Sequence, residues 1–128
     1  MSGFQGEWAR CRDWIAEALP YCGGFYGIGD IERAIAEGRM IFLPGRHCAL
    51  VLEICAYPNG KALNVFAGGG EKGGRTVKEY SEKMDPFITA FARNAGCKWV
   101  MHHCRPGGER VGLGLGYRKL WSVIVKDI

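Results

Sequence analysis

The feature that most constrains this chain is an apolar strand that leads through a glycine-rich turn into a helix. Residues 63–67 fit a buried strand, and glycines and charged residues fill the turn at 68–76. An amphipathic helix follows and ends at Gly96, and a second strand begins at once, at 97–103. The amides of such a turn and the positive end of the helix dipole can face one anion, commonly a pyrophosphate. The sequence therefore predicts a strand–helix–strand unit with a candidate phosphate site at its turn.

Length and composition bound the size and the surroundings of the protein. The chain has 128 residues, 48% of them hydrophobic, which is enough for one domain with its own core, over 1–128. No apolar run approaches the ~20 residues needed to cross a bilayer, and the N-terminus lacks the basic and apolar segments of a signal peptide. We therefore expect a protein of the cytoplasm with no membrane partner.

Charge and cysteine usage exclude further classes. The net charge of +4 is modest, and acidic residues separate the basic ones, so that no basic stripe forms. This pattern does not indicate dedicated nucleic-acid binding, and it suits a phosphate-bearing small molecule or an acidic protein surface. The six cysteines form no CxxC pair and follow no secretory signal, so we expect reduced, mostly buried thiols.

Histidine and cysteine side chains gather at 102–104 and suggest a test for a metal site. Alternation along a strand places His102 and Cys104 on one side, and His103 and Cys97 on the other. A closed zinc site needs four nitrogen or sulfur ligands, usually in closely spaced pairs. The pattern offers at most two adjacent ligands, so we expect no metal.

Periodicity and turn residues divide the whole chain into alternating elements. The expected helices are 7–19, 31–37 and 86–95, the last with a leading turn from Thr76, and the expected strands are 39–43, 47–57, 61–67, 97–103 and 118–126, with a loop at 105–116. Asp30 is expected to cap the second helix, and Pro58-Asn59-Gly60 to close an antiparallel hairpin. A right-handed crossover through the last helix makes its two flanking strands parallel. The predicted class is α/β of the α+β kind: a mixed, mostly antiparallel central sheet with helices on both faces.

This order of elements resembles the GCN5-related N-acetyltransferase (GNAT) fold over nearly the whole chain. Three local phrases, at 56–70, 92–97 and 104–111 before Gly116-Tyr117, look like the small GNAT-like proteins of tailed bacteriophages and prophages. The resemblance implies a protein of the bacterial host cytoplasm, or one incorporated into a virion.

The resemblance also implies a cofactor site. In acetyltransferases of this fold, the turn after the fourth strand carries a Q/R-x-x-G-x-G/A pattern whose amides hold the pyrophosphate of acetyl-CoA. With Gly73 on the first glycine of the pattern, Gly70 stands where Gln or Arg is expected and Arg75 where a small residue is expected. The residues implied to hold acetyl-CoA are Gly69, Gly70, Lys72, Gly73, Gly74, Arg75 and Thr76. The alternative is that 68–74 is only a surface connection.

The catalytic groups implied by the resemblance are fewer. Such enzymes commonly place a tyrosine acid four residues before a Gly-Phe or Gly-Tyr pair, and here that position is Gly112. Tyr117, the aromatic of the pair, is expected to pack. Glu53 could act as general base, because a carboxylate in a mostly apolar strand has a raised pKa. The alternative is a carboxylate at the rim, paired with a nearby Arg or Lys.

Two functions therefore stand after the sequence alone. The first is a GNAT-like accessory or virion-associated module with a degenerate acetyl-CoA site, which binds a protein such as a phage structural component. The second is an active acyl-CoA-dependent N-acetyltransferase that modifies an amine. Both are expectations from the resemblance and from the residues at the turn.

Overall fold

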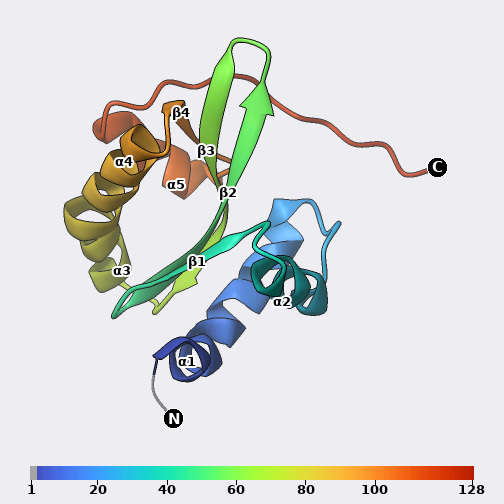
Figure 1. The fold of residues 1–128 in the computed structure, drawn as a ribbon, viewed down its shortest axis with the longest axis vertical. Coiled ribbons are helices and arrows are strands. Elements are labelled where there is room, and N and C mark those ends of the chain that lie inside the picture. Colours follow the sequence, from blue (N-terminus) through green and yellow to red (C-terminus); the bar gives the residue numbers. More distant parts are fainter. Residues whose placement is uncertain (1–2) are drawn as a thin grey trace.

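A computed structural model describes residues 3–128 and shows helices on the two faces of a four-stranded sheet (Figure 1). The helices are α1 (Gly3–Ala18), α2 (Ile28–Ala36), α3 (Gly74–Glu79), α4 (Asp85–Asn94) and α5 (Pro106–Gly114). The strands are β1 (Ile41–Pro44), β2 (Cys48–Tyr57), β3 (Gly60–Gly70) and β4 (Cys97–His102). A 3₁₀ turn, Leu19–Cys22, follows α1, and a π-helical turn, Tyr80–Met84, joins α3 to α4. Among the described residues, no helix is long and apolar enough to cross a membrane.

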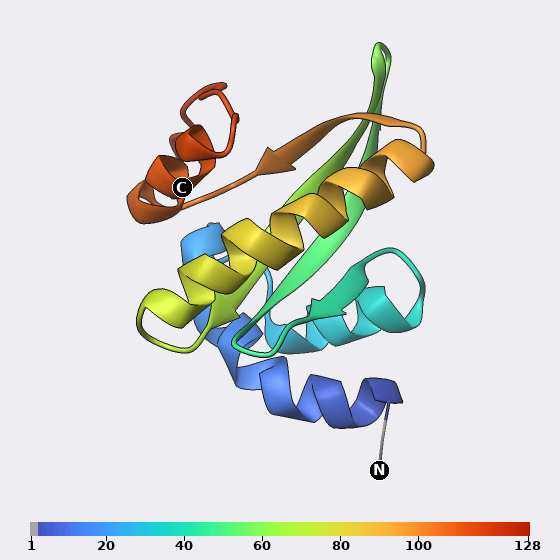
Figure 2. The ribbon, with the colours of Figure 1, turned by 90° about the vertical axis from the view of Figure 1, so that its left-hand side faces the viewer.

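The sheet has the strand order β1-β2-β3-β4. The first two pairings are antiparallel, and β3 and β4 are parallel because α3 and α4 carry the chain back between them. Helices α1 and α2 cover one face, and α3 and α4 cover the other (Figures 1 and 2). The predicted mixed, mostly antiparallel sheet with helices on both faces is confirmed.

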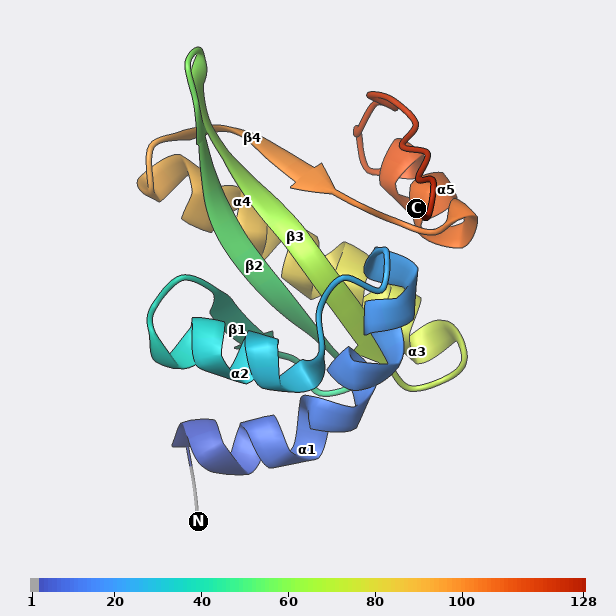
Figure 3. The same cartoon turned by 90° about the vertical axis from the view of Figure 1, so that its right-hand side faces the viewer.

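The core is divided between the two faces because successive side chains of β2 point in opposite directions. Ala49 and Val51 pack with Ile15 of α1 and with α2, whereas Leu50 and Leu52 pack against α4. The sheet is therefore buried on both sides where the helices lie. Its β2–β3 hairpin extends beyond them (Figure 3).

Helix α2 begins at Ile28, earlier than the predicted start at residue 31. Asp30 is not the capping residue but lies inside the first turn, where its Oδ2 accepts a hydrogen bond from the Gly27 amide at 2.9 Å. The Asp30 side chain therefore still accepts a hydrogen bond from a backbone amide at the helix start, but from a residue that precedes it in the chain.

The helix predicted at 86–95, with a short leading turn from Thr76, is instead continuously helical from Gly74 to Asn94. Pro86 has no amide hydrogen to donate and its ring crowds the preceding turn. The wider π-helical turn Tyr80–Met84 immediately precedes this position, so the chain stays helical from α3 into α4.

The C-terminal region differs most from the prediction. The expected loop at 105–116 contains α5, which begins with Pro106 at its first turn, a favoured position for proline. The expected strand at 118–126 does not form, and these residues are exposed and leave the body of the molecule (Figure 1). A strand-forming sequence adopts a strand only when an edge supplies its hydrogen bonds, and this segment pairs with none of the described strands.

Candidate functional site

The glycines of the predicted cradle have two different environments. Gly69 and Gly70 are not in a turn but at the end of β3, paired with Ala49 and Cys48 of β2. A β-carbon on Gly69 would overlap the Trp14 backbone of α1, and one on Gly70 would lie 2.5 Å from the His47 carbonyl oxygen. Close packing of neighbouring backbone therefore accounts for glycine at both positions.

The second part of the cradle is open. Gly73 has a φ of +110°, which favours glycine, and it precedes the first residue of α3. A β-carbon on Gly73 or Gly74 would meet nothing within 4 Å, and Lys72 and Arg75 are exposed. The start of α3 has no side-chain cap, so its amides and these two cations could meet an anion.

The remaining polar groups of the turn bind one another. The Thr76 hydroxyl donates to the Glu71 carbonyl oxygen at 2.6 Å, and the Glu71 amide donates to the His47 carbonyl oxygen at 2.8 Å. The Glu71 carboxylate lies 2.9 Å from Nδ1 of His47. The Thr76 hydroxyl is therefore already hydrogen-bonded within the turn, and Glu71 adds a negative charge to the turn.

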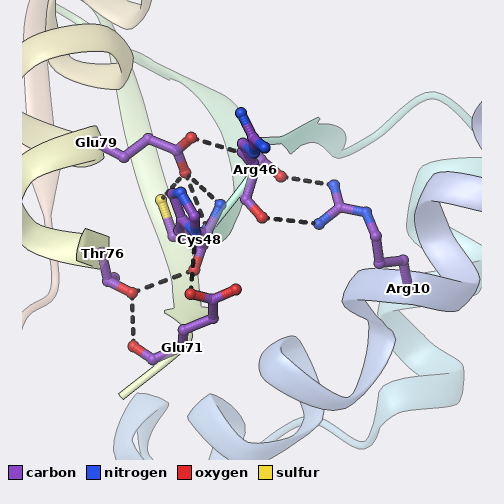
Figure 4. A network of polar contacts seen from close by, with 8 residues as sticks. Arg10, Arg46, Cys48, Glu71, Thr76 and Glu79 are labelled. Carbon is purple, nitrogen blue, oxygen red and sulfur yellow. Dashed lines mark hydrogen bonds and ion pairs between the residues drawn. The ribbon is translucent and has the colours of Figure 1, made fainter. Parts of the chain in front are cut away.

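A buried carboxylate organises the adjacent turn between β1 and β2. Glu79 of α3 is 9% exposed and accepts hydrogen bonds from the amides of Arg46, His47 and Cys48 at 2.9, 2.8 and 3.0 Å. Burial raises the pKa of Glu79, but the hydrogen bonds from these amides and from the Cys48 thiol outweigh it and lower the pKa below its ordinary value. Figure 4 shows Glu79 and Arg10 holding this turn from opposite sides, with Arg10 donating to the Arg46 carbonyl oxygen at 3.1 Å.

Strands β3 and β4 separate beyond the pair Val65–His102, because β3 continues to Gly70 whereas β4 ends (Figure 3). The 3₁₀ turn Leu19–Cys22 contacts both sides of this opening. The Cys22 thiol donates to the Phe66 carbonyl oxygen of β3 at 3.3 Å. The guanidinium of Arg105, which follows β4, lies 4.1 Å from the ring centre of Tyr21. The chain's own turn therefore bridges the diverging strands.

A cluster of aromatic and polar side chains lies between the end of β4 and the start of α4. The Tyr80 hydroxyl is hydrogen-bonded to Nε2 of His102, and the Tyr117 hydroxyl donates to Oδ1 of Asp85 at 2.7 Å. Burial lowers the pKa of His102 to about 4 and raises the pKa of both tyrosines. At neutral pH the imidazole is therefore neutral and both phenols keep their protons.

Glu53 of β2 lies opposite Asn64 of β3. The Asn64 amide nitrogen donates to Oε1 of Glu53 at 2.9 Å, and Asn64 is only 2% exposed. Oδ1 of Asn64 has no hydrogen-bond partner among the described residues. No ion pair found in that part of the chain involves Glu53, so the alternative of a carboxylate paired with Arg or Lys finds no support.

His102 is bonded to Tyr80 and does not meet other metal-ligating groups. Within residues 3–128 no group of three or more His, Cys, Asp or Glu side chains is arranged to hold a metal ion. A closed zinc site needs four nitrogen or sulfur ligands.

Comparisons with known proteins agree with this architecture. A crystal structure of a GNAT family acetyltransferase from Staphylococcus aureus subsp. aureus USA300_TCH1516 superposes with a TM-score of 0.61 and 9% sequence identity. The match covers 98% of this chain and 95% of that chain. This is the GNAT fold. No protein-family model matches the sequence, and neither does any curated protein searched.

In this GNAT-fold chain, the helix position expected to carry a tyrosine acid is Gly112 of α5, which has no ionisable group. A β-carbon on Gly112 would lie 3.7 Å from the β-carbon of Tyr117. Tyr117 packs there, as the sequence predicted, and its hydroxyl additionally binds Asp85. The expected acid position thus carries no acid, and a β-carbon there would make an ordinary van der Waals contact with Tyr117.

The predicted site residues lie at two separate places on the GNAT frame. The cradle lies where β3 meets α3, beside Cys48, whereas Glu53 is five residues further along β2, about 17 Å away at the rise of a strand. Sequence reasoning considered His102 only as a metal ligand, and it did not point to Glu79 or to Cys22. Their partners are distant in the chain, 22 residues for His102 and Tyr80 and 44 for Cys22 and Phe66, so no local pattern reports them.

Proposed function

We propose that this protein is a GNAT-fold accessory or virion-associated module, encoded by a tailed bacteriophage or prophage, that binds another protein and no longer uses acetyl-CoA. It acts in the bacterial cytoplasm or within a virion. The observation that carries the proposal is the bridge across the opening between β3 and β4. Cys22 binds the Phe66 carbonyl there, and Tyr21 packs on Arg105, so the chain's own 3₁₀ turn contacts both sides of the opening.

The cradle supports the same interpretation. Packing accounts for Gly69 and Gly70, and the Thr76 hydroxyl is bonded to the Glu71 carbonyl. A carboxylate at Glu71 repels a pyrophosphate, which leaves Lys72, Gly73, Gly74 and Arg75 as the available groups. These residues are exposed to water and could hold a phosphate group only weakly.

Protein binding is favoured by charge and by exposed apolar surface. The net charge of +4 suits an acidic partner surface, such as a phage structural component. Phe25 and Tyr26, which precede α2, are 71% and 42% exposed. Exposed apolar surface of this kind marks interaction sites in folded proteins.

The test is the melting temperature of the protein with increasing acetyl-CoA. A ligand that binds only the folded state raises the melting temperature in proportion to the logarithm of its concentration over its dissociation constant. We expect no change up to millimolar acetyl-CoA. A shift that grows with the logarithm of the acetyl-CoA concentration, and that falls in Arg75→Ala but not in Arg93→Ala, would contradict the proposal.

The second candidate function, an acyl-CoA-dependent N-acetyltransferase, is favoured by one observation. The buried Oδ1 of Asn64 has no partner, and it lies beside the Glu53 carboxylate. A buried acceptor without a donor is costly, and an amine N–H could satisfy it. Glu53 would take the proton from the amine nitrogen, which would attack the thioester carbonyl, and the departing thiolate would take up a proton from solvent.

This candidate predicts a separation of binding from chemistry. Glu53→Gln keeps the hydrogen-bonding shape of the side chain but cannot accept the proton, so kcat should fall by ~10²–10⁴-fold. Acetyl-CoA binding should not change, because Glu53 is remote from the cradle. Thiol release from acetyl-CoA with a panel of primary amines measures the rate, and Glu17→Gln, at an exposed carboxylate of α1, is the matched control. Release by the wild type that Glu53→Gln leaves intact would remove Glu53 from the mechanism.

A further inference from the structure

The C-terminal segment 118–128 is an exposed, extended part of the chain that contains six large apolar residues. The large apolar side chains of residues 118–126 are exposed, from 51% for Leu120 to 94% for Ile124. β-branched and aromatic residues are those that favour strands, and this segment contains Trp121 and, after Ser122, the run Val123-Ile124-Val125. The segment thus has the composition of a strand, but its backbone donors and acceptors are unpaired.

The sheet offers an edge of the same kind. Its outer strands are β1 and β4, and β4 pairs on one side only, with β3. Strand β1 is four residues long and carries Pro44, which has no amide hydrogen for a further strand. Strand β4 has six residues and no proline, and its Trp99 is 41% exposed. The edge of β4 is therefore the one able to accept another strand.

The segment does not reach the β4 of its own chain. Its first residues are fixed by Tyr117, whose hydroxyl donates to Asp85 of α4 at 2.7 Å. From there the chain runs past the sheet and ends far from β4 (Figure 1). The superposition on the GNAT-fold crystal structure covers 98% of this chain. Residues 118–128 are eleven of the 128 residues, more than the uncovered 2%, so the superposition includes part of this segment.

We propose that two copies of this chain exchange their C-terminal segments, so that residues 118–126 of each form a strand on the free β4 edge of the other. Each copy has one unpaired strand-forming segment and one unpaired sheet edge. In a twofold dimer, the segment of each copy pairs with the edge of the other, so no segment and no edge stays unpaired. Nine extended residues span about 30 Å and cover the roughly 20 Å of β4 completely.

The side-chain pattern fits this placement. Alternation puts Trp121, Val123 and Val125 on one face of the strand, and Leu120 and Ile124 on the other. Apolar residues on both faces are typical of a strand inside a sheet rather than one exposed to water. On the β4 side, Trp99 supplies exposed apolar surface for one of these faces.

The experiment measures the oligomeric state of the full chain by light scattering after size-exclusion chromatography. We expect a dimer whose melting temperature rises with protein concentration. Val123→Pro removes an amide hydrogen in the middle of the strand and should raise the dimer dissociation constant at least tenfold. Val123→Thr keeps a β-branched residue and should remain dimeric. Because Val123 is 73% exposed, neither change disturbs the core.

Hydrogen exchange then identifies the paired strands. The amides of 121–125 and of β4 should be protected in the dimer, and both should lose protection in Val123→Pro. A monomer with an unprotected segment would overturn the proposal, and so would a monomer with a protected one, which would mean pairing with its own chain. A dimer that Val123→Pro leaves intact would also overturn it. The acetyl-CoA titration is independent of all these results.

Discussion

At the scale of single residues, Glu79 does more than its position in the sequence suggests. Its carboxylate accepts hydrogen bonds from three successive backbone amides, those of Arg46, His47 and Cys48. Successive amides that converge in this way form an anion-binding concavity, and here the anion is a side chain of the same protein. Glu79 thereby attaches the turn between β1 and β2 to α3, the helix that begins at the cradle.

Replacing this carboxylate should destabilise the fold. Glu79→Gln keeps one carbonyl oxygen but turns an NH₂ group toward backbone donors, so we expect a loss of roughly 2–4 kcal/mol in the free energy of unfolding. Glu82→Gln is the matched control, because it removes the same charge from an exposed position in the following turn. Urea denaturation measures both variants. A loss of similar size in the two would show that charge, and not the amide contacts, is responsible.

At the scale of elements, the strand and helix around the glycines fit together more closely than a turn requires. Gly69 allows the backbone of α1 at Trp14 to lie directly on β3, and Gly70 allows β3 to reach His47. A glycine-rich stretch predicts close approach and flexibility equally well, and the local sequence contains no information about which backbone will come near. Only the packing of α1 on the sheet assigns Gly69 and Gly70 to the strand.

The π-helical turn Tyr80–Met84 is a second case at this scale. Pro86 signals an interruption, and the sequence prediction placed the start of the main helix there. The structure keeps the chain helical by widening one turn, which directs Tyr80 toward His102 of β4. The interruption is local, but the contact that uses it is between elements distant in sequence.

At the scale of the whole molecule, His102 couples stability to pH. Its pKa is lowered to about 4, from an ordinary value of 6.5, by burial and to a smaller degree by the charge of the neighbouring His103. Tyr80 and Tyr117 pack against the ring, and Asp85 binds the Tyr117 hydroxyl, so protonation would place a charge inside a packed cluster. The neutral form is therefore the one compatible with the fold.

The sign of the effect follows from linkage. Between pH 6.5 and about 4 the unfolded chain binds the proton and the folded chain does not, so stability is present above pH 6.5 and is lost as the pH falls. We expect the free energy of unfolding to be about 2 kcal/mol lower at pH 5 than at pH 7.5. Urea denaturation at both pH values measures it. His102→Gln should flatten this dependence and the exposed His103→Gln should not; equal profiles in all three proteins would refute the role of His102.

The sequence by itself determined the order of most elements, the antiparallel hairpin of β2 and β3, and the parallel return to β4. These depend on periodicity and on turn residues such as Asn59-Gly60 and Gly96, which act over a few residues. It also located the cradle at the start of α3, since the change from strand to helix period is a local signal. Glu53 and the cradle residues remain predictions of function.

Only the tertiary structure decided what these parts do together. It assigned Gly69 and Gly70 to packing, bridged the opening with Cys22, and left 118–126 without a strand to pair with. Each of these depends on groups that are far apart in the chain, and a strand in particular has no hydrogen bonds until an edge is supplied. The sequence of this segment predicts a strand, but whether a sheet edge is free to pair with it depends on how the whole chain folds.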